Sequence, residues 1–363
     1  PIDMTLAVRS PGSALKPFIY GLAFEAGLAH PETLIEDRPW RFAGYAPQNF
    51  DNTFHGTVTV RFALQASLNV PAVKLLAAIS PARLSARLRQ AGFNIDMPRN
   101  LAVALGGVGL RLEDLASLYV ALARGGEPTP LRFVVNTAPT GSTTETPSER
   151  PSTPLLRPAA AWYVIDILRG VNPPSLAQSG AIAFKTGTSY GYRDGWAAGF
   201  DGRYVVATWI GRPDGTPTPG LTGLSAAAPL LFDVFAQISP ERVPFALPPN
   251  DVLKATTTTL PPPLMHFLEP GASISQPTSN IDPPIHIAFP PDQAELELAK
   301  ETNGTYSPFV FKAEGGILPF TWLINGAPID APAHHREAYW TPTGEGFVQL
   351  SVMGAGTGRR PFS

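Results

Sequence analysis

The chain of 363 residues contains no cysteine. A cysteine nucleophile, a disulfide framework, an iron–sulfur cluster and a cysteine-ligated zinc site are therefore excluded. Charged residues are also scarce, at 15% of the chain against about 25% in ordinary soluble proteins, and 27 basic residues nearly balance 29 acidic ones. No basic stripe alternates with aromatic residues, so a nucleic-acid partner is not expected.

Long hydrophobic runs are absent as well. No apolar run reaches the ~18 residues of a membrane span, and Pro1 to Met4 resemble neither a signal peptide nor a natural start. We therefore expect a fragment, with any membrane anchor upstream of it. What is present suffices for a core, since 44% of the residues are hydrophobic and the length corresponds to two or three domains at ~150 residues each.

Apolar patterns predict a mostly helical beginning followed by strands. The run from Pro17 to Leu28 is apolar nearly all round, which indicates a helix buried inside a large domain. Further helices are expected at 60–66, 71–78, 81–91, 112–123, 162–169 and 226–236, a surface loop at 136–154, and strands at 181–187, 194–200 and 204–211 with an Asp201-Gly202 turn before the last.

A proline- and threonine-rich stretch divides the chain. We predict an α+β domain at 1–245, a linker at 246–284 and a small all-β sandwich at 285–363. Strands of the sandwich are expected at 294–299, 309–316, 320–329 with an Asn325-Gly326 turn, 338–341 and 347–353.

Two of the six lysines stand in motifs. Ser13-Ala14-Leu15-Lys16 follows a Pro11-Gly12 turn at the start of the predicted core helix, so the Ser13 hydroxyl and the Lys16 amine share a helix face. A neutral Lys16 can take the proton of Ser13, provided that burial and a second cation, Lys185, lower its pKa from ~10.4 toward ~7. The alternative for this motif alone is an ordinary helix start with an exposed lysine.

Ser67-Leu68-Asn69 interrupts two helical patterns, because Pro71 fits the first position of a new helix and disfavours helix at Val70. We expect these residues on a loop. There Ser67 can relay a proton to a leaving amine and Asn69 can bind a substrate amide, although both side chains are also ordinary helix caps.

Lys185-Thr186-Gly187-Thr188 ends a predicted strand. Gly187 lets a substrate backbone lie close, and the hydroxyls of Thr186 and Thr188 can bind a carboxylate beside Lys185. An edge strand of this kind binds extended peptides by strand addition, whereas the alternative is a strand-end turn with a solvated lysine.

Ser-x-x-Lys, Ser-x-Asn and Lys-Thr-Gly in this order form the motif set of penicillin-binding proteins and class A β-lactamases, with Leu68 where that set has Asp. The chain resembles the transpeptidase domain of the bifunctional class A penicillin-binding proteins, in particular the 1C subgroup, over residues 1 to about 245. The resemblance is carried by RSPGSALKPFIYGLAFEAGL, GYAPQNFDNTFHGTVTVRFALQASLNVPAV and FKTGTSYGYRDGWAAGFDGRYVVATWIGRPDG. The C-terminal part resembles the small domain appended to that subgroup.

The resemblance implies an antiparallel sheet with a helical lobe and a peptidoglycan D,D-transpeptidase activity without cofactor or metal. Ser13 would attack the D-Ala-D-Ala carbonyl of a stem peptide, release D-Ala and pass the acyl group to an amine, with Lys16 as the base, and β-lactams would acylate the same serine. The further implied residues are Ser67 and Lys185 in the proton and electrostatic network, Asn69 on the acyl chain, Thr186, Gly187 and Thr188 at the terminal carboxylate, and the N–H groups of Ser13 and Thr188 as the oxyanion hole.

The resemblance also implies parts outside this chain. These are a glycosyltransferase domain, a membrane anchor at the periplasmic face of the inner membrane, and the first strands of the transpeptidase sheet, since only 12 residues precede Ser13. Cell-envelope protein partners would bind through the C-terminal domain.

Other patterns favour structural roles. Gly106-Gly107-Val108-Gly109 predicts a turn rather than a nucleotide loop, and His334-His335 predicts surface residues rather than a metal pair. A Ser-His-Asp triad through His30 or His55 is not expected, because Lys16 already serves Ser13. A group of aromatic residues is expected in a sandwich core rather than in a glycan platform, namely Phe309, Phe311, Phe320, Trp322, Tyr339 and Trp340.

Two other functions stay open from the sequence. A serine β-lactamase would need a glutamate in a deacylation motif, and none is recognisable between Asn69 and Lys185. A non-catalytic envelope scaffold that binds peptidoglycan peptides would keep its cellular function without Ser13.

Overall fold

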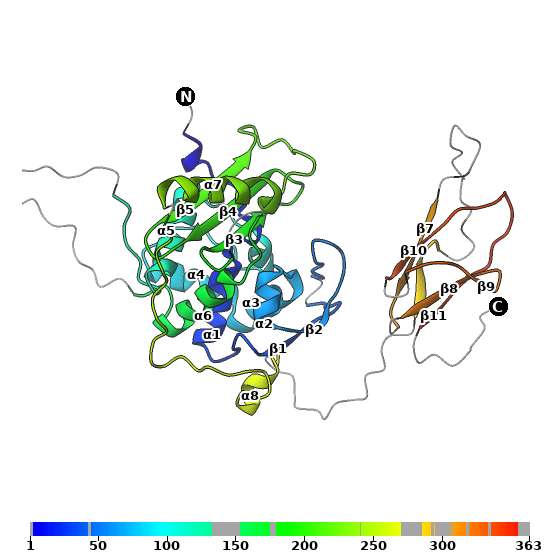
Figure 1. The fold of residues 1–363 in the computed structure, drawn as a ribbon, viewed down its shortest axis with the longest axis horizontal. Helices are drawn as coiled ribbons and strands as arrows, with labels where there is room; N and C mark the ends of the chain where they lie inside the picture. The colour runs from blue at the N-terminus through cyan, green and yellow to red at the C-terminus, as the bar shows by residue number, and fades with distance from the viewer. Residues whose placement is uncertain are drawn as a thin grey trace, which may run out of the picture. The chain divides into compact units, whose positions relative to one another are not determined.

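Figure 1 shows the fold in the computed structural model of the chain. The structure describes residues 3–42, 45–132, 153–174, 179–239, 241–269, 285–291, 294, 306, 308–316, 319–332 and 335–354. The chain divides into two compact units, residues 1–272 and 273–363. Most of the loop predicted at 136–154, residues 295–299 of the strand predicted at 294–299, and His334 lie outside the described residues.

Helix α1 (Lys16–Glu25) forms the centre of the first unit. All of its residues from Lys16 to Phe24 are buried, which confirms the helix predicted from an apolar pattern on every side. It packs against α3 (Asn69–Ile79) and α6 (Pro158–Arg169). The other helical elements of this unit are η1 (Met4–Leu6), η2 (Gly12–Leu15), α2 (Val60–Gln65), α4 (Pro81–Gln90), η3 (Leu101–Leu105), α5 (Leu112–Ala123), the π-helical turn η4 (Gly223–Ala227), α7 (Ala228–Ile238) and α8 (Pro262–Met265).

A three-stranded antiparallel sheet lies beside this helical core. Its strands are β3 (Ala183–Thr188), β4 (Asp194–Phe200) and β5 (Val205–Gly211), in the order β3-β4-β5, as predicted. Side chains alternate between the two faces of the sheet, so Ala183 packs into the main core while Phe184 packs against α7. Both faces are therefore covered, and β3 is an edge strand among the described strands.

A second hairpin is formed by β1 (Leu34–Asp37) and β2 (Gly56–Thr59). Residues 246–269, which we call the strap, cross this part of the unit. The Thr33 hydroxyl donates to the Leu264 carbonyl (2.6 Å), the Phe267 N–H donates to the Leu34 carbonyl (2.8 Å), and Leu260 is buried. The structure differs here from the predicted linker, because the strap is hydrogen-bonded to the first unit.

The second unit contains two three-stranded antiparallel sheets. One has the order β10-β7-β6 and the other β11-β8-β9. Side chains of both sheets share one core, which confirms a small β domain. The strands are β6 (His286–Phe289), β7 (Phe309–Glu314), β8 (Phe320–Ile324), β9 (Ala327–Pro328), β10 (Glu337–Trp340) and β11 (Leu350–Gly354).

Two details of this unit test the sequence predictions. Asn325 and Gly326 both have positive φ, as a two-residue hairpin turn between β8 and β9 requires. Phe311, Phe320 and Trp322 are buried in the core as expected, whereas Tyr339 is 59% exposed because its position on β10 faces away from the core.

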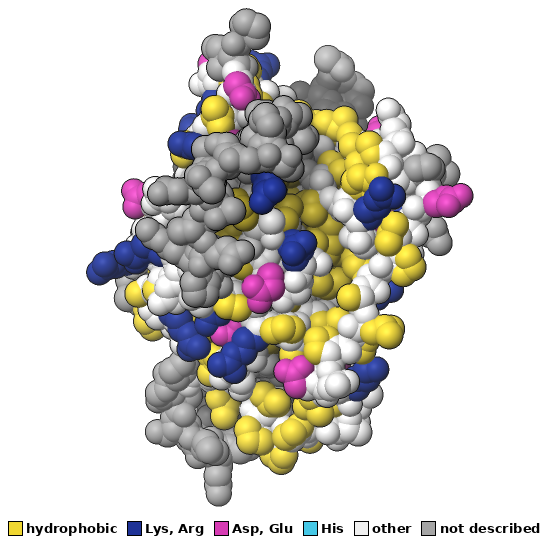
Figure 2. Space-filling view, turned by 90° about the vertical axis from the view of Figure 1, so that its left-hand side faces the viewer, with side chains coloured by type: hydrophobic (Ala, Val, Ile, Leu, Met, Phe, Trp, Pro, Cys, Tyr) yellow, Lys and Arg dark blue, Asp and Glu magenta, His cyan; other side chains and the backbone are white. Residues whose placement is uncertain are grey.

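The surface carries mixed charge. On the face drawn in Figure 2, basic side chains lie among apolar and acidic ones, in keeping with the net charge of −2. Within the described ranges, no helix has both the length and the hydropathy needed to cross a membrane.

Candidate active site

Ser13 and Lys16 stand at the junction of η2 and α1. Ser13 is half-buried in the short η2 turn, and Lys16 is the first residue of α1 and is completely buried. The buried Tyr119 hydroxyl donates to the Ala14 carbonyl (3.0 Å) and so fixes the turn between them. The predicted helix start is confirmed, and its lysine is an interior residue rather than an exposed one.

The Lys16 amine points to the Ser67-Leu68-Asn69 motif. Its Nζ donates to the carbonyls of Ser67 (2.7 Å) and Leu68 (3.1 Å) and to Oδ1 of Asn69 (2.7 Å). Burial, and after it the charge of Lys185, holds the pKa of Lys16 well below its usual value. These are the two causes that the sequence analysis required for a lysine base.

Lys185 contacts the same motif from β3. Its Nζ donates to Oγ of Ser67 (2.8 Å) and to the Thr186 carbonyl (2.8 Å). Burial lowers the pKa of Lys185 to about 7. Ser67 thus links the two lysines, with its carbonyl on Lys16 and its hydroxyl on Lys185.

The backbone at Ser67 differs from the prediction of a longer loop. Ser67 has φ +60°, a left-handed conformation that costs a non-glycine residue about 1–3 kcal/mol. Leu68 is the N-cap and α3 already begins at Asn69, so Val70 is helical although Pro71 follows it. The proline is tolerated because the first-turn N–H groups of a helix have no intrahelical acceptor.

Close backbone contacts join the first and third motifs. A side-chain carbon on Gly187 would overlap the Pro11 carbonyl, and one on Gly12, which has φ +55°, would overlap the backbone of Thr188. Only glycine fits at both positions. The turn that carries Ser13 therefore lies directly against the end of β3.

The Gly106-Gly107-Val108-Gly109 stretch packs against the turn that carries Ser13. Gly106 has φ +90° and ends η3, and a side-chain carbon there would overlap the backbone of Gly12. The hydroxyl of Ser10 donates to the Gly106 carbonyl (2.7 Å). The prediction of a structural turn is confirmed, and the turn lies beside the first motif.

Thr188 and Thr186 are both half-buried at the end of β3. Oγ1 of Thr188 accepts a hydrogen bond from the Gly223 N–H (3.0 Å). Because that oxygen accepts from the protein, its own hydrogen is available to donate to a bound carboxylate.

Sequence reasoning missed Asp37 and Asn49. Asp37 is completely buried at the end of β1, and its carboxylate accepts from Nδ2 of Asn49 (3.0 and 2.8 Å) and from the N–H of His55 (2.8 Å). Oδ1 of Asn49 accepts from the N–H of Asn69 (2.7 Å). Both residues stand within or near the conspicuous GYAPQNFDN region, but no motif spacing pointed to either.

The structure does not assemble a Ser-His-Asp triad among the described residues. The ring of His55 contacts Asp37 (Nδ1 to Oδ2, 3.2 Å), and the ring of His30 contacts the Leu253 carbonyl (3.0 Å). Neither ring makes a hydrogen bond to Ser13, in agreement with the expectation from the sequence.

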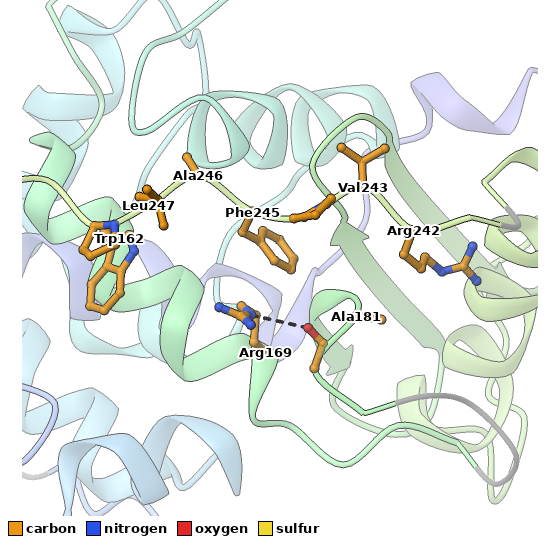
Figure 3. Close-up of a pocket in the computed structure, with 11 residues that line it drawn as sticks. Trp162, Arg169, Ala181, Arg242, Val243, Phe245, Ala246 and Leu247 are labelled. Atoms are coloured by element: carbon orange, nitrogen blue, oxygen red, sulfur yellow. Dashed lines mark hydrogen bonds between the residues drawn. The ribbon is translucent and has the colours of Figure 1, made fainter.

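A separate pocket of about 340 Å³ opens between α6 and the beginning of the strap (Figure 3). The Arg169 guanidinium lies 4.9 Å from the centre of the Phe245 ring, and its Nε donates to the Gly180 carbonyl (3.4 Å). None of the residues of the three motifs lines this pocket.

Comparisons with known proteins agree with the geometry. Residues 3–235 match the penicillin binding protein transpeptidase domain family, and residues 274–360 match the penicillin-binding protein C-terminus family. The chain is 44% identical over 241 residues to penicillin-binding protein 1C of Escherichia coli, which covers 64% of this chain and 30% of that protein. It is 33% identical over 256 residues to penicillin-binding protein 1B of Vibrio cholerae, covering 66% and 32%. The chain thus spans under a third of the length of these two relatives.

Solved structures show the same fold. The PonA1 protein of Mycobacterium tuberculosis, in complex with penicillin V, aligns with a TM-score of 0.58 at 21% identity, over 70% of this chain and 75% of that chain. Penicillin-binding protein 1A of Haemophilus influenzae aligns with a TM-score of 0.55 at 21% identity, over 68% and 45%. The predicted α+β transpeptidase fold is confirmed. Since the transpeptidase match covers well over half of the chain and includes all three motifs, the chain belongs to the penicillin-binding protein transpeptidase family.

Proposed function

We propose that the first unit is a peptidoglycan D,D-transpeptidase that works through an acyl-enzyme on Ser13 and is acylated there by β-lactams. One observation carries the proposal: two buried amines, Lys16 and Lys185, bond to opposite sides of Ser67 next to the turn that bears Ser13. A lysine with a lowered pKa is a competent general base near neutral pH.

In the acylation step, the neutral Lys16 amine takes the proton of the Ser13 hydroxyl while Oγ forms a bond to the carbonyl carbon of the penultimate D-Ala. The N–H groups of Ser13 and Thr188 stabilise the negative oxygen that develops. The bond to the terminal D-Ala then breaks, and the leaving nitrogen receives a proton that the Ser67 hydroxyl relays from the lysine pair. In the second half of the reaction, an acceptor amine attacks the acyl carbon and gives a proton to Lys16. The bond to Oγ of Ser13 then breaks, and Oγ takes back a proton from the lysine pair.

The third motif binds the substrate's terminal carboxylate. Lys185 lies in β3 beside Thr186 and Thr188, and a hydroxyl that donates to a carboxylate makes a short, charge-assisted hydrogen bond. Arrival of the carboxylate favours the ammonium form of Lys185. The edge position of β3 suits an extended peptide that adds as a further strand, with Gly187 leaving room at the Ser13 turn.

Asn69 has a double role in this proposal. Its Oδ1 accepts from Lys16, and its Nδ2 donates to the Gln48 carbonyl (2.6 Å). The second hydrogen of Nδ2 is left for the acyl chain of the substrate. Asn69 thus orients both the base and the peptide.

D-Ala release from a synthetic stem pentapeptide tests the proposal. The chain is expected to release D-Ala and to attach an added amine acceptor, whereas Ser13→Ala is expected to lose at least about 10³-fold in rate. Mass spectrometry of the products measures both reactions. Ser117→Ala is the matched control, since that hydroxyl donates within α5 (2.8 Å to the Glu113 carbonyl). Release of D-Ala by Ser13→Ala at the rate of the parent would overturn the assignment.

The wider setting belongs to the same proposal. Penicillin-binding proteins act in the cell envelope, and we place this domain at the periplasmic face of the inner membrane, in a longer protein that also has glycosyltransferase activity. The transpeptidase domain corresponds to residues 1–245 and the small β domain to residues 285–363, through which envelope proteins bind.

A further inference from the structure

Asp37 is a buried carboxylate that the proposed mechanism does not use. Besides the side-chain amide of Asn49 and the N–H of His55, it contacts only the ring of His55 (3.2 Å) among the ion pairs of the described residues. No lysine or arginine is paired directly with it there. Burial of a carboxylate is tolerated where hydrogen-bond donors surround it, and electrostatic interactions are stronger in a low dielectric than in water.

A chain of hydrogen bonds leads from Asp37 to the base. Nδ2 of Asn49 faces acceptors only, namely Asp37 and the Thr53 carbonyl (2.8 Å), while its Oδ1 faces the N–H of Asn69. These partners fix the orientation of the Asn49 amide. Asn69 in turn accepts from Lys16 through Oδ1 (2.7 Å). Each link is between 2.7 and 3.0 Å long.

The charges of the site form a set of two amines and one carboxylate. Burial is the largest cause that lowers the pKa of Lys16; the charge of Lys185 lowers it further, and the charge of Asp37 raises it. Tyr20, one helical turn beyond Lys16 on α1, is buried, and burial followed by the charge of Asp37 raises its pKa. A carboxylate near two amines favours positive charge on them, so Asp37 opposes the effects of burial and of the neighbouring lysine.

We propose that Asp37 is a positioning residue that acts through Asn49 and Asn69, fixing the Lys16 amine beside Ser67 and stabilising positive charge on the Lys16–Lys185 pair. This inference rests on the proposed role of Lys16 as the base. The neutral Lys16 amine then serves Ser13, and the proton that it takes stays on the pair until the leaving group receives it.

The rate of Ser13 acylation by a penicillin, measured against pH, separates the two parts of this role. Asp37→Asn removes the carboxylate, so the pKa of Lys16 falls. The rise of the acylation rate on the acidic side of the pH profile is then expected to move to lower pH by about one unit. In Asn49→Ala the Asp37 side chain is kept, but its hydrogen-bonded link to Asn69 is broken. The maximal acylation rate is then expected to fall about 10- to 100-fold, while the acidic side of the pH profile stays at the same pH.

Asp201→Asn is the matched control. Asp201 is also buried, and its carboxylate also accepts from N–H groups, here the backbone N–H groups of Arg203 and Tyr204 (both 2.8 Å), but it lies in the β4–β5 turn. We expect this variant to lose stability and to keep the pH profile of the parent. If Asp37→Asn behaves like Asp201→Asn, the role of Asp37 is structural and the inference is overturned.

A readout that needs no catalysis separates this inference from the proposed function. The chain has six lysines, so NMR of protein with ¹³Cε-labelled lysine gives few signals, and Lys16→Met assigns the one of interest. The Lys16 signal is expected to titrate at lower pH in Asp37→Asn than in the parent. An unchanged titration overturns the inference even where penicillin acylates Ser13. If the Lys16 titration shifts as expected but penicillin does not acylate the parent chain, only the proposed function is overturned.

Discussion

Burial sets the chemistry of single residues in this site. Lys16 and Lys185 have almost no exposed surface, so water cannot stabilise their ammonium forms. The unfolded chain has no such penalty, and its lysines hold their protons up to a pH of ~10.4. Folding therefore expels protons from this site in the neutral and mildly alkaline range, and stability depends on pH in a defined direction.

This linkage predicts the behaviour of Lys185→Met. With a folded pKa of about 7, Lys185 is neutral in the folded state but still protonated in the unfolded state between pH 7 and ~10. The free energy of unfolding of the parent gains up to about 1.4 kcal/mol per pH unit over this range from this residue, and the variant gains none of it. Urea unfolding at pH 6, 8 and 10 is expected to show the stability advantage of Lys185→Met shrink as the pH rises.

The control for this prediction is Lys254→Met, which removes a solvent-exposed amine. Its stability is expected to run parallel to that of the parent at all three pH values. A constant difference between Lys185→Met and the parent would mean that Lys185 does not change its protonation on folding. Lys185→Met is also expected to lose acylation, because the hydroxyl of Ser67 loses its partner.

Motif spacing singles out the lysines and serines that the folded chain brings together in the candidate site. Ser13 and Lys16 are three residues apart on one helical turn, which is a local relation that the sequence determines. Asp37 and Asn49 were not predicted, because their relation to Lys16 runs through the β1–β2 hairpin and the start of α3. Such a relation depends on which buried polar groups find partners in the folded chain, and it leaves no spacing pattern.

Among the elements, short turns with glycine decide how closely the motifs approach one another. The turn at Gly12 lies between the end of β3 and the turn at Gly106, and neither contact leaves space for a side-chain carbon. The three motifs come from η2, the α2–α3 turn and β3. Their geometry is therefore fixed by backbone contacts as well as by hydrogen bonds.

Gly106→Ala and Gly27→Ala form a test of this packing. Both glycines have positive φ, which costs an alanine about 1–2 kcal/mol, but Gly27 has open space where Gly106 meets Gly12. Gly27→Ala is expected to lose about this amount of stability and keep the acylation rate. Gly106→Ala is expected to lose more stability and to acylate at least about 10-fold more slowly, because the Ser13 turn must move. Equal acylation rates in the two variants would show that the contact does not position Ser13.

Apolar patterns predict most helix positions closely, but two elements, α3 and the strap, differ from the prediction. Helix α3 starts earlier than the pattern predicts, because the first turn of a helix accepts a proline despite the bias of the preceding residue away from helix. Composition alone predicts a linker where the strap lies. Its contacts with Thr33 and Leu34 are made by backbone groups at its far end, and composition carries no information on them.

At the scale of the whole molecule, the two units have separate cores with different architecture. The first is a helical core with a covered sheet, and the second is a small β domain around Phe311, Phe320 and Trp322. The α+β class and the all-β C-terminal part were both predicted, because each has a distinct hydrophobic period over many residues. The exact domain boundaries depend on tertiary contacts. The strap shows this, because the contacts of the first unit continue well beyond α7, the helix that packs on the sheet.

The central claim is that Ser13 is the nucleophile of a penicillin-sensitive acyl-enzyme. Intact mass spectrometry of the whole chain after incubation with a penicillin tests it most directly, followed by peptide mapping and a time course. We predict one lasting adduct per chain, located on Ser13 and absent from Ser13→Ala. An adduct on another residue, or none on a folded chain, would contradict the claim, and rapid loss of the adduct would identify a β-lactamase instead.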